Sequence, residues 1–246
     1  MNRVGDTNIE QKMALWLKER GIELDDTQWR QFEQYYEQLA EWNQKMNLTA
    51  IENRDDVYIK HFYDSISLSF FVSLDQVQTL ADIGSGAGFP SIPLKIMYPH
   101  LRITIIDALN KRITFLRHLV ETLKLDQVEC IHARAEDAAR LKEHRDAYEV
   151  VTARAVARMN VLNELCLPFV KPSGIFVAMK GSQAPQELEE AQASFRLLGA
   201  QLEQVHRFLL PSEQAERHII IVRKKTHTPK RFPRKAGEPA RHPLRK

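Results

Sequence analysis

The residues whose types and spacing point most directly to chemistry are three glycines, Gly84, Gly86 and Gly88, within the segment ADIGSGAGFP (81–90). Glycines at such positions let the backbone turn tightly and let a ligand approach without meeting a Cβ atom. The spacing is G-x-G-x-G, which differs from the G-x-G-x-x-G of dinucleotide-binding folds, and no Lys-Ser/Thr pair follows, as a phosphate-binding P-loop requires. The loop could therefore hold a nucleoside that carries an amino-acid moiety, or it could be a plain strand-to-helix turn.

Acidic residues accompany three of the strands that we expect. Asp82 precedes the glycines at the end of one strand, and Asp107 and Glu136 come at the ends of the next two, over 102–107 and 128–132. Open α/β sheets bind ligands at the carboxyl ends of their strands, so these acids should meet at one edge. Asp107 could accept both hydroxyls of a ribose, or it could cap the helix that follows. Glu136, or the backbone amides beside it, could contact an adenine, or its segment could simply cap a short helix.

Three basic residues near the same edge are candidates for positioning a substrate: Lys111, Arg134 and Lys180. Each could bind an RNA phosphate or guanine O6, or could be a solvated charge or part of a salt bridge. His61 and Asp64, at positions i and i+3 of an expected helix, could border the pocket or could form a local pair on that helix. No group of His, Cys, Asp and Glu in the sequence has metal-ligand spacing, so we expect no metal.

The elements that must position these residues fall into two parts. The N-terminal third has the apolar spacing of helices, including a capping box formed by Asp25 and Gln28. From residue 79, short β-rich runs alternate with helical ones, which predicts an α/β fold with a mostly parallel sheet covered on both faces. The last two runs, 202–210 and 218–224, lack a helix between them and should form an antiparallel hairpin. The expected parts are a helical module (1–75), a sheet domain (76–222) and a basic tail (223–246).

The charge of the chain is unevenly distributed. Its 246 residues contain 35 Lys+Arg and 32 Asp+Glu, a net charge of +3, yet residues 223–246 hold ten Lys/Arg and one acid, which is +9. The other 222 residues therefore carry −6. This excludes a uniformly basic protein and favours an acidic body with a cationic tail for a phosphate-rich partner. Four prolines in the tail predict an extended segment, or one that is disordered until it binds.

The cysteine content and the distribution of apolar residues indicate the compartment in which the protein works. Cys130 and Cys166 are too few for a disulfide framework and lie in apolar runs, so we expect buried structural thiols in a reducing compartment. The first residues lack the apolar region of a secretory signal, and no apolar run has the length of a membrane span. We therefore expect a cytoplasmic protein. Nothing in the sequence demands a dimer, so a monomer is the default.

Several motifs together resemble one known family, the bacterial 16S rRNA guanine-N7 methyltransferases, also called glucose-inhibited division protein B. The resemblance covers nearly the whole chain, and NLTAI, NKRITFL and TARAVA are more specific to this family than the glycine loop is. The motifs are EWNQKMNLTAI (41–51), KHFYDS (60–65), ADIGSGAGFPSIPLKI (81–96), IDALNKRITFL (106–116), HARAED (132–137), TARAVA (152–157), VAMKG (177–181), ERHIIIVRK (216–224) and TPKRFPRKAGEP (228–239).

The resemblance implies a Rossmann-like class I methyltransferase fold with S-adenosylmethionine as cofactor. It implies that Gly84, Phe89, Ala135-Glu136 and Arg154 build the cofactor pocket, with Asp107 on the ribose. It also implies the substrate, which is N7 of a guanine in the 530 loop of 16S rRNA (guanine 527 in the family's usual rRNA numbering). The RNA would be modified in the small ribosomal subunit or its precursor.

The implied reaction requires few catalytic groups from the protein. Guanine N7 carries an in-plane lone pair, so its methylation needs no general base, and catalysis would come from aligning N7, the methyl carbon and the sulfur. The sequence agrees, because the fourth expected strand ends in TARAVA and not in the Asn-Pro-Pro-Tyr type of segment used on exocyclic amines. Two alternatives stay open: a class I methyltransferase acting on another RNA position or on protein, and a non-catalytic ribosome-assembly factor that kept the fold. The glycine spacing disfavours an oxidoreductase.

Overall fold

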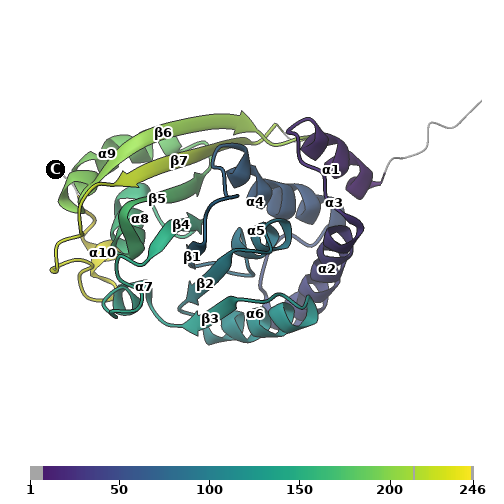
Figure 1. The fold of residues 1–246 in the computed structure, drawn as a ribbon, viewed down its shortest axis with the longest axis horizontal. Helices are drawn as coiled ribbons and strands as arrows, with labels where there is room; N and C mark the ends of the chain where they lie inside the picture. The colour runs from purple at the N-terminus through teal and green to yellow at the C-terminus, as the bar shows by residue number, and fades with distance from the viewer. Residues whose placement is uncertain (1–7, 213, 245–246) are drawn as a thin grey trace, which may run out of the picture.

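Within residues 8–212 and 214–244, which the computed structural model describes, seven strands form one sheet in the order β3-β2-β1-β4-β5-β7-β6 (Figure 1). The first five strands are parallel, and β7 runs antiparallel to both β5 and β6, which confirms the predicted closing hairpin. The strands are β1 (Thr79–Ile83), β2 (Arg102–Asp107), β3 (Val128–His132), β4 (Tyr148–Arg154), β5 (Val170–Lys180), β6 (Ala200–Leu209) and β7 (Glu216–Lys224).

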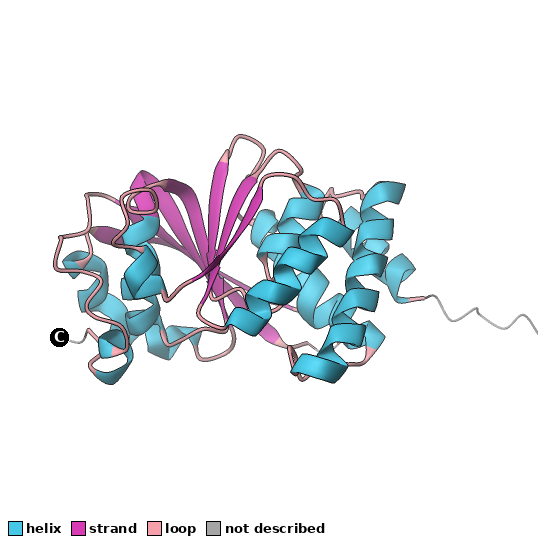
Figure 2. Cartoon of the chain, turned by 90° about the horizontal axis from the view of Figure 1, so that it is seen from below, coloured by secondary structure: helices cyan, strands magenta, loops and turns pink. Residues whose placement is uncertain are grey.

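Helices cover both faces of this sheet (Figure 2). One face packs against α5 (Ser91–Met97), α6 (Asn110–Thr122) and the N-terminal helices, and the other packs against α7 (Ala135–Ala138), α8 (Met159–Cys166) and α9 (Ala184–Leu197). A short 3₁₀ turn, η3 (Leu167–Phe169), joins α8 to β5. Each face buries its own apolar core, as expected for parallel strands that are covered on two sides. The predicted fold class is therefore confirmed.

The N-terminal helices continue the core of the first face without a break. Tyr35 donates a hydrogen bond to the carbonyl of Ala87, at 2.6 Å, so this module contacts the glycine loop directly. The predicted capping box is present, because Asp25 Oδ1 accepts the Gln28 amide at 2.8 Å and Gln28 Oε1 accepts the Asp25 amide at 2.9 Å. The elements are α1 (Ile9–Lys18), α2 (Asp26–Met46), α3 (Arg54–Val57), a π-helical segment η1 (Tyr58–Tyr63), α4 (Asp64–Ile66) and a 3₁₀ turn η2 (Ser67–Phe70).

The C-terminal segment differs from the extended or disordered tail that its composition suggested. Residues 225–244, named here the strap, lie on the α7 and α8 side of the sheet, with Phe232 and Pro239 buried and a short helix, α10 (Glu238–Arg241) (Figure 1). The expected start of the tail at residue 223 also falls inside β7. Composition could not reveal this packing, because it depends on partners far away in the sequence. Among the described residues, no helix has the length and apolar character that a bilayer crossing needs.

Candidate functional site

The three glycines of the loop after β1 have different surroundings. All have positive φ, +74° at Gly84, +64° at Gly86 and +106° at Gly88, a region that side chains disfavour. A Cβ at Gly84 would lie 2.7 Å from Val156, and a Cβ at Gly88 would lie 2.7 Å from the Tyr35 hydroxyl. A Cβ at Gly86 would have no atom within 4 Å. Two of the glycines are thus required by packing, whereas Gly86 exposes its backbone to open space that a ligand can use.

Asp107 meets this loop, as the sequence predicted. The register pairs Ile83 of β1 with Ile106 of β2, which brings the residues after them to the same edge. The Asp107 carboxylate is 3% exposed, and its Oδ2 accepts the Gly86 amide at 3.1 Å and Arg112 Nη1 at 3.2 Å. Its Oδ1 accepts the Leu109 amide at 2.9 Å. The side chain therefore holds the turn before α6 and also lies against the glycine loop.

Asp82 is buried beneath the loop with one oxygen unused. Its Oδ2 accepts the Ser85 hydroxyl at 2.6 Å and the Ser91 amide at 3.3 Å, but its Oδ1 has no hydrogen-bond partner. Burial raises the pKa of Asp82 to about 6, although both serines and Arg154 act to lower it. A buried acceptor without a partner is costly in a folded protein. The arrangement fits a site for a ligand that carries positive charge or donates hydrogen bonds.

Phe89 lies in a stack of rings and not on an open surface. Its ring is buried between Tyr35, at 5.3 Å and 16°, and His61, at 4.3 Å and 17°. The Arg154 guanidinium lies 5.0 Å from the centre of the Phe89 ring. Phe89 thus ties the N-terminal helices to the edge of the sheet, and any contact it makes with a cofactor stays a prediction.

Arg154, at the end of β4, organises a network with the π-helical segment η1 and α4. Its Nη1 donates to Asp64 Oδ2 and to the Lys60 carbonyl, each at 2.9 Å, and its Nη2 donates to His61 Nδ1 at 3.0 Å. Asp64 also accepts Arg217 Nε at 3.2 Å. His61 and Asp64 therefore bind a common arginine instead of pairing with each other. π-Helical segments occur often at functional sites, and this one presents His61 to Arg154.

His61 is held in its neutral form by this network. Because Arg154 can only donate, Nδ1 of His61 is the acceptor, and Nε2 carries the proton and faces Thr49 Oγ1 at 2.9 Å. Burial, and then the charge of Arg154, lower the pKa of His61 to about 3. Both ring nitrogens are thus in use, and the ring carries no charge at neutral pH.

A cavity of about 640 Å³ opens at the carboxyl ends of β4 and β5, in front of this network. It adjoins the glycine loop, because Val156 lines the cavity and lies against Gly84. Its wall holds five cations and two acids, Asp64 and Glu187, which is a local charge of +3. The cations are Lys60, Arg154, Arg158, Lys180 and Arg217. Lys60 and Arg158 also pair with acids outside the wall, Asp56 at 3.2 Å and Glu190 at 2.7 Å, which leaves a net charge of +1 that still favours an anionic ligand.

The structure gives the three predicted substrate-positioning cations different settings. Lys180 lines the cavity, but its Nζ lies 2.6 Å from Glu187 Oε2, so its charge is paired. Lys111 Nζ donates to the Met46 carbonyl at 2.7 Å and so links α6 to the end of α2. Arg134 is exposed, and its side chain has no hydrogen bond or ion pair with another residue of the described ranges. Arg134 is thus available to a partner, and the substrate roles of all three stay predictions.

Ala135 and Glu136 begin α7, directly after β3. Glu136 is buried, and its Oε1 accepts the Gly237 amide of the strap at 2.8 Å. The side chain of Glu136 thus has a partner that the sequence did not suggest. A contact with adenine through the backbone amides of Ala135-Glu136, the other option left open by the sequence, stays a prediction.

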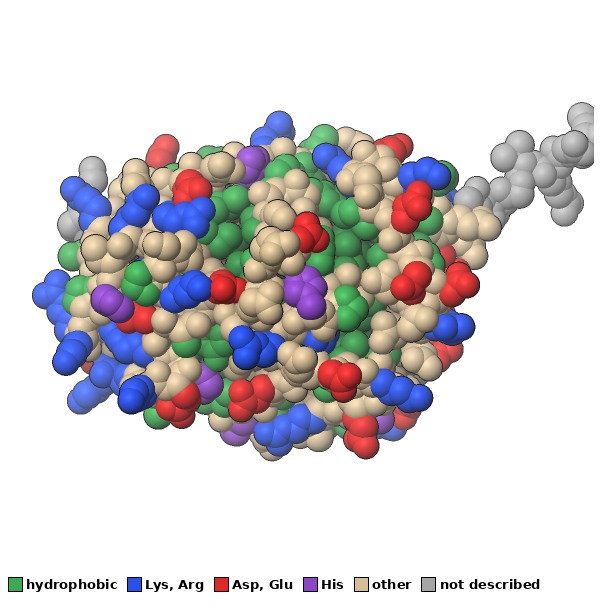
Figure 3. All heavy atoms as spheres, viewed as in Figure 1, with side chains coloured by type: hydrophobic (Ala, Val, Ile, Leu, Met, Phe, Trp, Pro, Cys, Tyr) green, Lys and Arg blue, Asp and Glu red, His purple; other side chains and the backbone are tan. Residues whose placement is uncertain are grey.

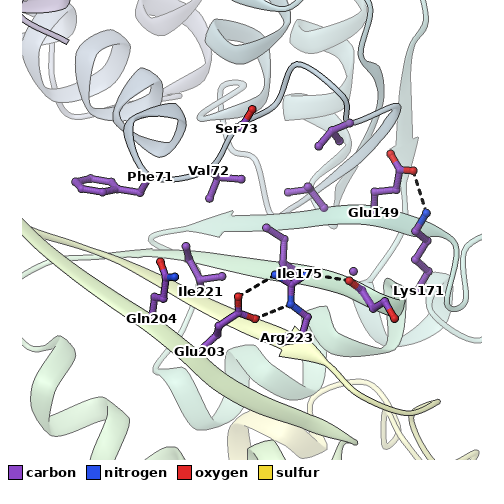
Figure 4. A pocket seen from close by; sticks show the side chains of 14 residues that line it. Phe71, Val72, Ser73, Glu149, Lys171, Ile175, Glu203, Gln204, Ile221 and Arg223 are labelled. Atoms are coloured by element: carbon purple, nitrogen blue, oxygen red, sulfur yellow. Dashed lines mark hydrogen bonds and ion pairs between the residues drawn. The ribbon is translucent and has the colours of Figure 1, made fainter. Parts of the chain in front are cut away.

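A second cavity, of about 500 Å³, lies at the opposite edge of the sheet, near the amino ends of β4 and β5 (Figure 4). Its charged groups pair with one another, Lys171 with Glu149 at 2.9 Å and Arg223 with Glu203 at 2.9 Å. Val72, Ile175 and Ile221 line it between these pairs. With no net charge on its wall and far from the glycine loop, this cavity is not the candidate site.

Sequence reasoning overlooked Tyr35, Thr49 and Arg217. Arg217 belongs to the polar start of β7, Glu216–His218, which precedes the apolar run 219–222 at the edge where ligands bind, and that polar start was the available signal. Cys130 and Cys166 are free and buried, as predicted, and burial raises the pKa of Cys130 to about 11. In the part of the chain that the structure describes, no group of three or more His, Cys, Asp or Glu could hold a metal ion.

Comparison with known proteins identifies the family. The GidB family model, described as rRNA small subunit methyltransferase G, matches residues 28–220. The chain belongs to this family. Ribosomal RNA small subunit methyltransferase G of Bacillus licheniformis is 54% identical over 237 residues, which are 96% of this chain and 99% of that protein. The Bacillus subtilis protein of the same name is 51% identical, with the same coverage of both chains.

Solved structures share the fold at low identity. A predicted O-methyltransferase from Agrobacterium tumefaciens matches with a TM-score of 0.54 and 16% identity, over 66% of this chain and 81% of that one. TYW2 of M. jannaschii, solved in complex with AdoMet, matches with a TM-score of 0.51 and 15% identity, over 67% of this chain and 75% of that one. These matches support the α/β methyltransferase-like sheet, and the family assignment rests on the relatives above.

Proposed function

We propose that this protein transfers the methyl group of S-adenosylmethionine to N7 of a guanine in the 530 loop of 16S rRNA, guanine 527 in the family's usual rRNA numbering. The reaction would take place in the cytoplasm, on the small ribosomal subunit or its precursor. The observation that carries the choice of N7 is the cavity wall, where the groups able to accept a proton already have partners. His61 is neutral with both nitrogens engaged, Asp64 binds two arginines, and Glu187 binds Lys180.

This wall suits a nucleophile that needs no deprotonation. An exocyclic amine or a ribose hydroxyl would have to lose a proton as it is methylated, whereas N7 attacks with its free lone pair. Without a general base, rate acceleration comes from alignment and from the exclusion of water. The arginine-lined cavity would hold the guanine and a neighbouring phosphate, because arginine side chains bind both guanine O6/N7 and phosphate oxygens.

The residues at the glycine loop fit the cofactor. S-adenosylmethionine, when bound, supplies an electrophilic methyl group on a positively charged sulfur. Gly86 offers a backbone surface with no Cβ, and Asp107 beside it can accept ribose hydroxyls once Arg112, whose side chain is one-third exposed, releases Oδ2. The unpartnered Oδ1 of Asp82 can accept a hydrogen bond from the amino-acid portion.

The test is methylation of unmodified small ribosomal subunits with labelled S-adenosylmethionine, followed by borohydride/aniline cleavage and primer extension. N7-methylguanine is labile to this treatment, so a strong stop in the 530 loop is expected. Label incorporated elsewhere, or without cleavage, would favour a methyltransferase with another target. Binding of the cofactor by calorimetry without any transfer would favour a non-catalytic assembly factor. Naked 16S rRNA, assayed in parallel, shows which form of the RNA is the substrate.

A further inference from the structure

The strap carries a group of exposed basic residues that form no salt bridge with other described residues. Residues 225–244 contain six Lys/Arg and one acid, which is +5. Figure 3 shows Lys and Arg gathered at the end of the molecule where Figure 1 places the strap. Five of the six are exposed and form no salt bridge with another described residue. These five are Lys225, Lys230, Arg231, Lys235 and Arg241.

The sixth cation, Arg234, anchors the strap to α8. Glu164 of α8 is completely buried, and both of its carboxylate oxygens accept hydrogen bonds from Arg234. Arg234 Nε lies 2.9 Å from Oε1, Nη2 lies 2.6 Å from Oε2, and the Arg234 amide lies 2.7 Å from Oε1. A carboxylate buried this completely needs such a set of donors, because an isolated buried charge is strongly unfavourable. The pair therefore fixes the middle of the strap in one position.

Further contacts fix the strap on either side of this anchor. Lys224 is buried and binds Asp146 Oδ1 at 3.1 Å, near the amino end of β4. Arg145 donates to the carbonyls of Thr228 and Phe232, at 2.7 and 3.0 Å. At the other end, the Gly237 amide binds Glu136, which follows the carboxyl end of β3. The strap therefore crosses from the amino edge of the sheet to the edge that holds the glycine loop.

This route brings the far end of the strap, around Gly237, close to the edge of the sheet that holds the glycine loop. The amide of Ala133, three residues before Glu136, donates to the Asp107 carbonyl at 3.2 Å, so the end of the strap lies close to the strand end that carries Asp107. Arg134, which has no partner among the described residues, lies between the two. On the same side, exposed Arg140 donates to the Pro233 carbonyl of the strap.

We infer that the strap is a preformed phosphate-binding surface for RNA, held in place by Glu164 and Glu136. The inference rests on the proposed function, which supplies an RNA substrate. It differs from a flexible cationic arm, because the exposed cations are fixed before binding and do not have to be ordered by the RNA. Ordering a chain segment on binding weakens affinity, and a surface that is already ordered avoids this loss. Glu164 thus acts as a positioning residue for RNA binding, although it is an acid.

Replacement of Glu164 distinguishes two explanations of RNA binding, the net charge of the protein and the fixed position of the strap, because they predict opposite changes in affinity. Glu164→Gln and Glu203→Gln each remove one negative charge from an Arg–Glu pair in which Nε and Nη2 of the arginine both donate to the carboxylate. Glu203 pairs with Arg223 and forms no hydrogen bond or salt bridge with residues of the strap, so it is the control for the loss of charge. If only charge matters, both variants bind RNA as tightly as wild type or more tightly. If the strap is preformed, Glu164→Gln binds about tenfold more weakly and Glu203→Gln does not.

Binding is measured by filter retention of unmodified small ribosomal subunits over a range of KCl concentrations. Calorimetry with S-adenosylmethionine and circular dichroism show whether each variant is folded. Wild-type affinity in folded Glu164→Gln would overturn the inference. Methyl transfer by wild type is assayed separately, so that the two proposals can fail independently. Transfer by wild type together with RNA binding that does not depend on the anchor overturns only this inference, and anchor-dependent binding without transfer supports it and overturns only the proposed reaction.

A charge variant keeps the inference testable if Glu164→Gln does not fold. Lys230→Gln/Arg231→Gln/Lys235→Gln alters three exposed side chains that form no salt bridge among the described residues, and it leaves the anchor intact. Each lost phosphate contact should reduce the salt slope by about 0.7–0.9 and the affinity by about fourfold at physiological salt. Deletion of residues 223–246 is a poorer test, because it also removes buried Lys224 and uncovers the surface under Phe232. An unchanged salt slope in the triple variant would contradict the inference.

Discussion

Replacement of Gly86 by alanine separates the role of the glycine loop in binding from its role in folding. Gly86 has a φ of +64°, and a Cβ placed there would have no atom within 4 Å. Gly21 follows the first helix, remote from Gly86 in the sequence, and has a φ of +72°. A Cβ placed there would also have no atom within 4 Å. A side chain in this left-handed region costs roughly 1–2 kcal/mol. Gly86→Ala and Gly21→Ala should therefore lose the same, modest free energy of unfolding.

The two variants should differ in their affinity for the cofactor. The new methyl group of Gly86→Ala points into the open space beside Asp107, whereas that of Gly21→Ala is remote from the site. We expect Gly86→Ala to bind S-adenosylmethionine at least about tenfold more weakly, a loss of about 1.4 kcal/mol, and Gly21→Ala to bind as wild type does. Urea denaturation gives the stabilities and isothermal titration calorimetry gives the affinities.

A third variant, Gly88→Ala, tests a glycine that packing requires. Its Cβ would lie 2.7 Å from the Tyr35 hydroxyl and 2.8 Å from Ile92, so its loss of stability should exceed that of the other two variants. Equal affinity of Gly86→Ala and Gly21→Ala for the cofactor would refute the reasoning, since Gly86 would then not form the surface that the ligand approaches. Equal stability of Gly88→Ala and Gly21→Ala would refute the packing role assigned to Gly88.

Three further predictions concern groups whose pKa is shifted by burial. Asp82 has a folded-state pKa of about 6, above its usual 3.8, so the folded protein binds the extra proton between these values. The free energy of unfolding should therefore fall by about 2 kcal/mol as pH rises from 4 to 6, relative to Asp82→Asn, and parallel urea profiles would contradict this. His61 has the opposite sign: its pKa is lowered from 6.5 to about 3, so the unfolded state binds the extra proton. Acidification from pH 6.5 to 4.5 should thus cost wild type about 2–3 kcal/mol more than His61→Gln, and equal losses in the two proteins would argue against a buried neutral ring. Finally, a thiol reagent at pH 8 should leave Cys130 and Cys166 unmodified in the native protein and react with both in urea, because burial raises the pKa of both thiols; rapid native reaction would show that they are accessible.

The parts of the site that could be predicted from the sequence are those determined by local spacing and by strand order. The glycine loop and Asp107 follow consecutive parallel strands, and the carboxyl ends of such strands meet at one edge whatever the rest of the chain does. The Asp25/Gln28 capping box is equally local, because its two residues are one helical turn apart. These features needed no knowledge of distant contacts.

The parts that could not be predicted depend on contacts across the fold. Glu164 looks like any surface acid in the sequence, and only the packing of α8 shows that it is buried and bound to Arg234. Lys180 ends a strand, and the sequence does not show that Glu187, in the helix that follows, pairs with it. Basic composition with four prolines suggested disorder, since composition counts charges without showing which of them has a buried partner.

Two groups of basic residues therefore make different contributions to RNA binding. At the cavity, Arg154 and Arg217 are both bound to the buried Asp64, so each guanidinium has a defined position. A cation held in this way contributes orientation, because moving it breaks a pair that costs about 3–5 kcal/mol to disrupt when buried. The exposed cations of the strap have no acidic partner among the described residues, so their field is not cancelled and they contribute affinity that depends on salt. An enzyme without a general base requires both capacities, since it must first hold a large polyanion and then place one of its atoms within attack distance of a methyl group.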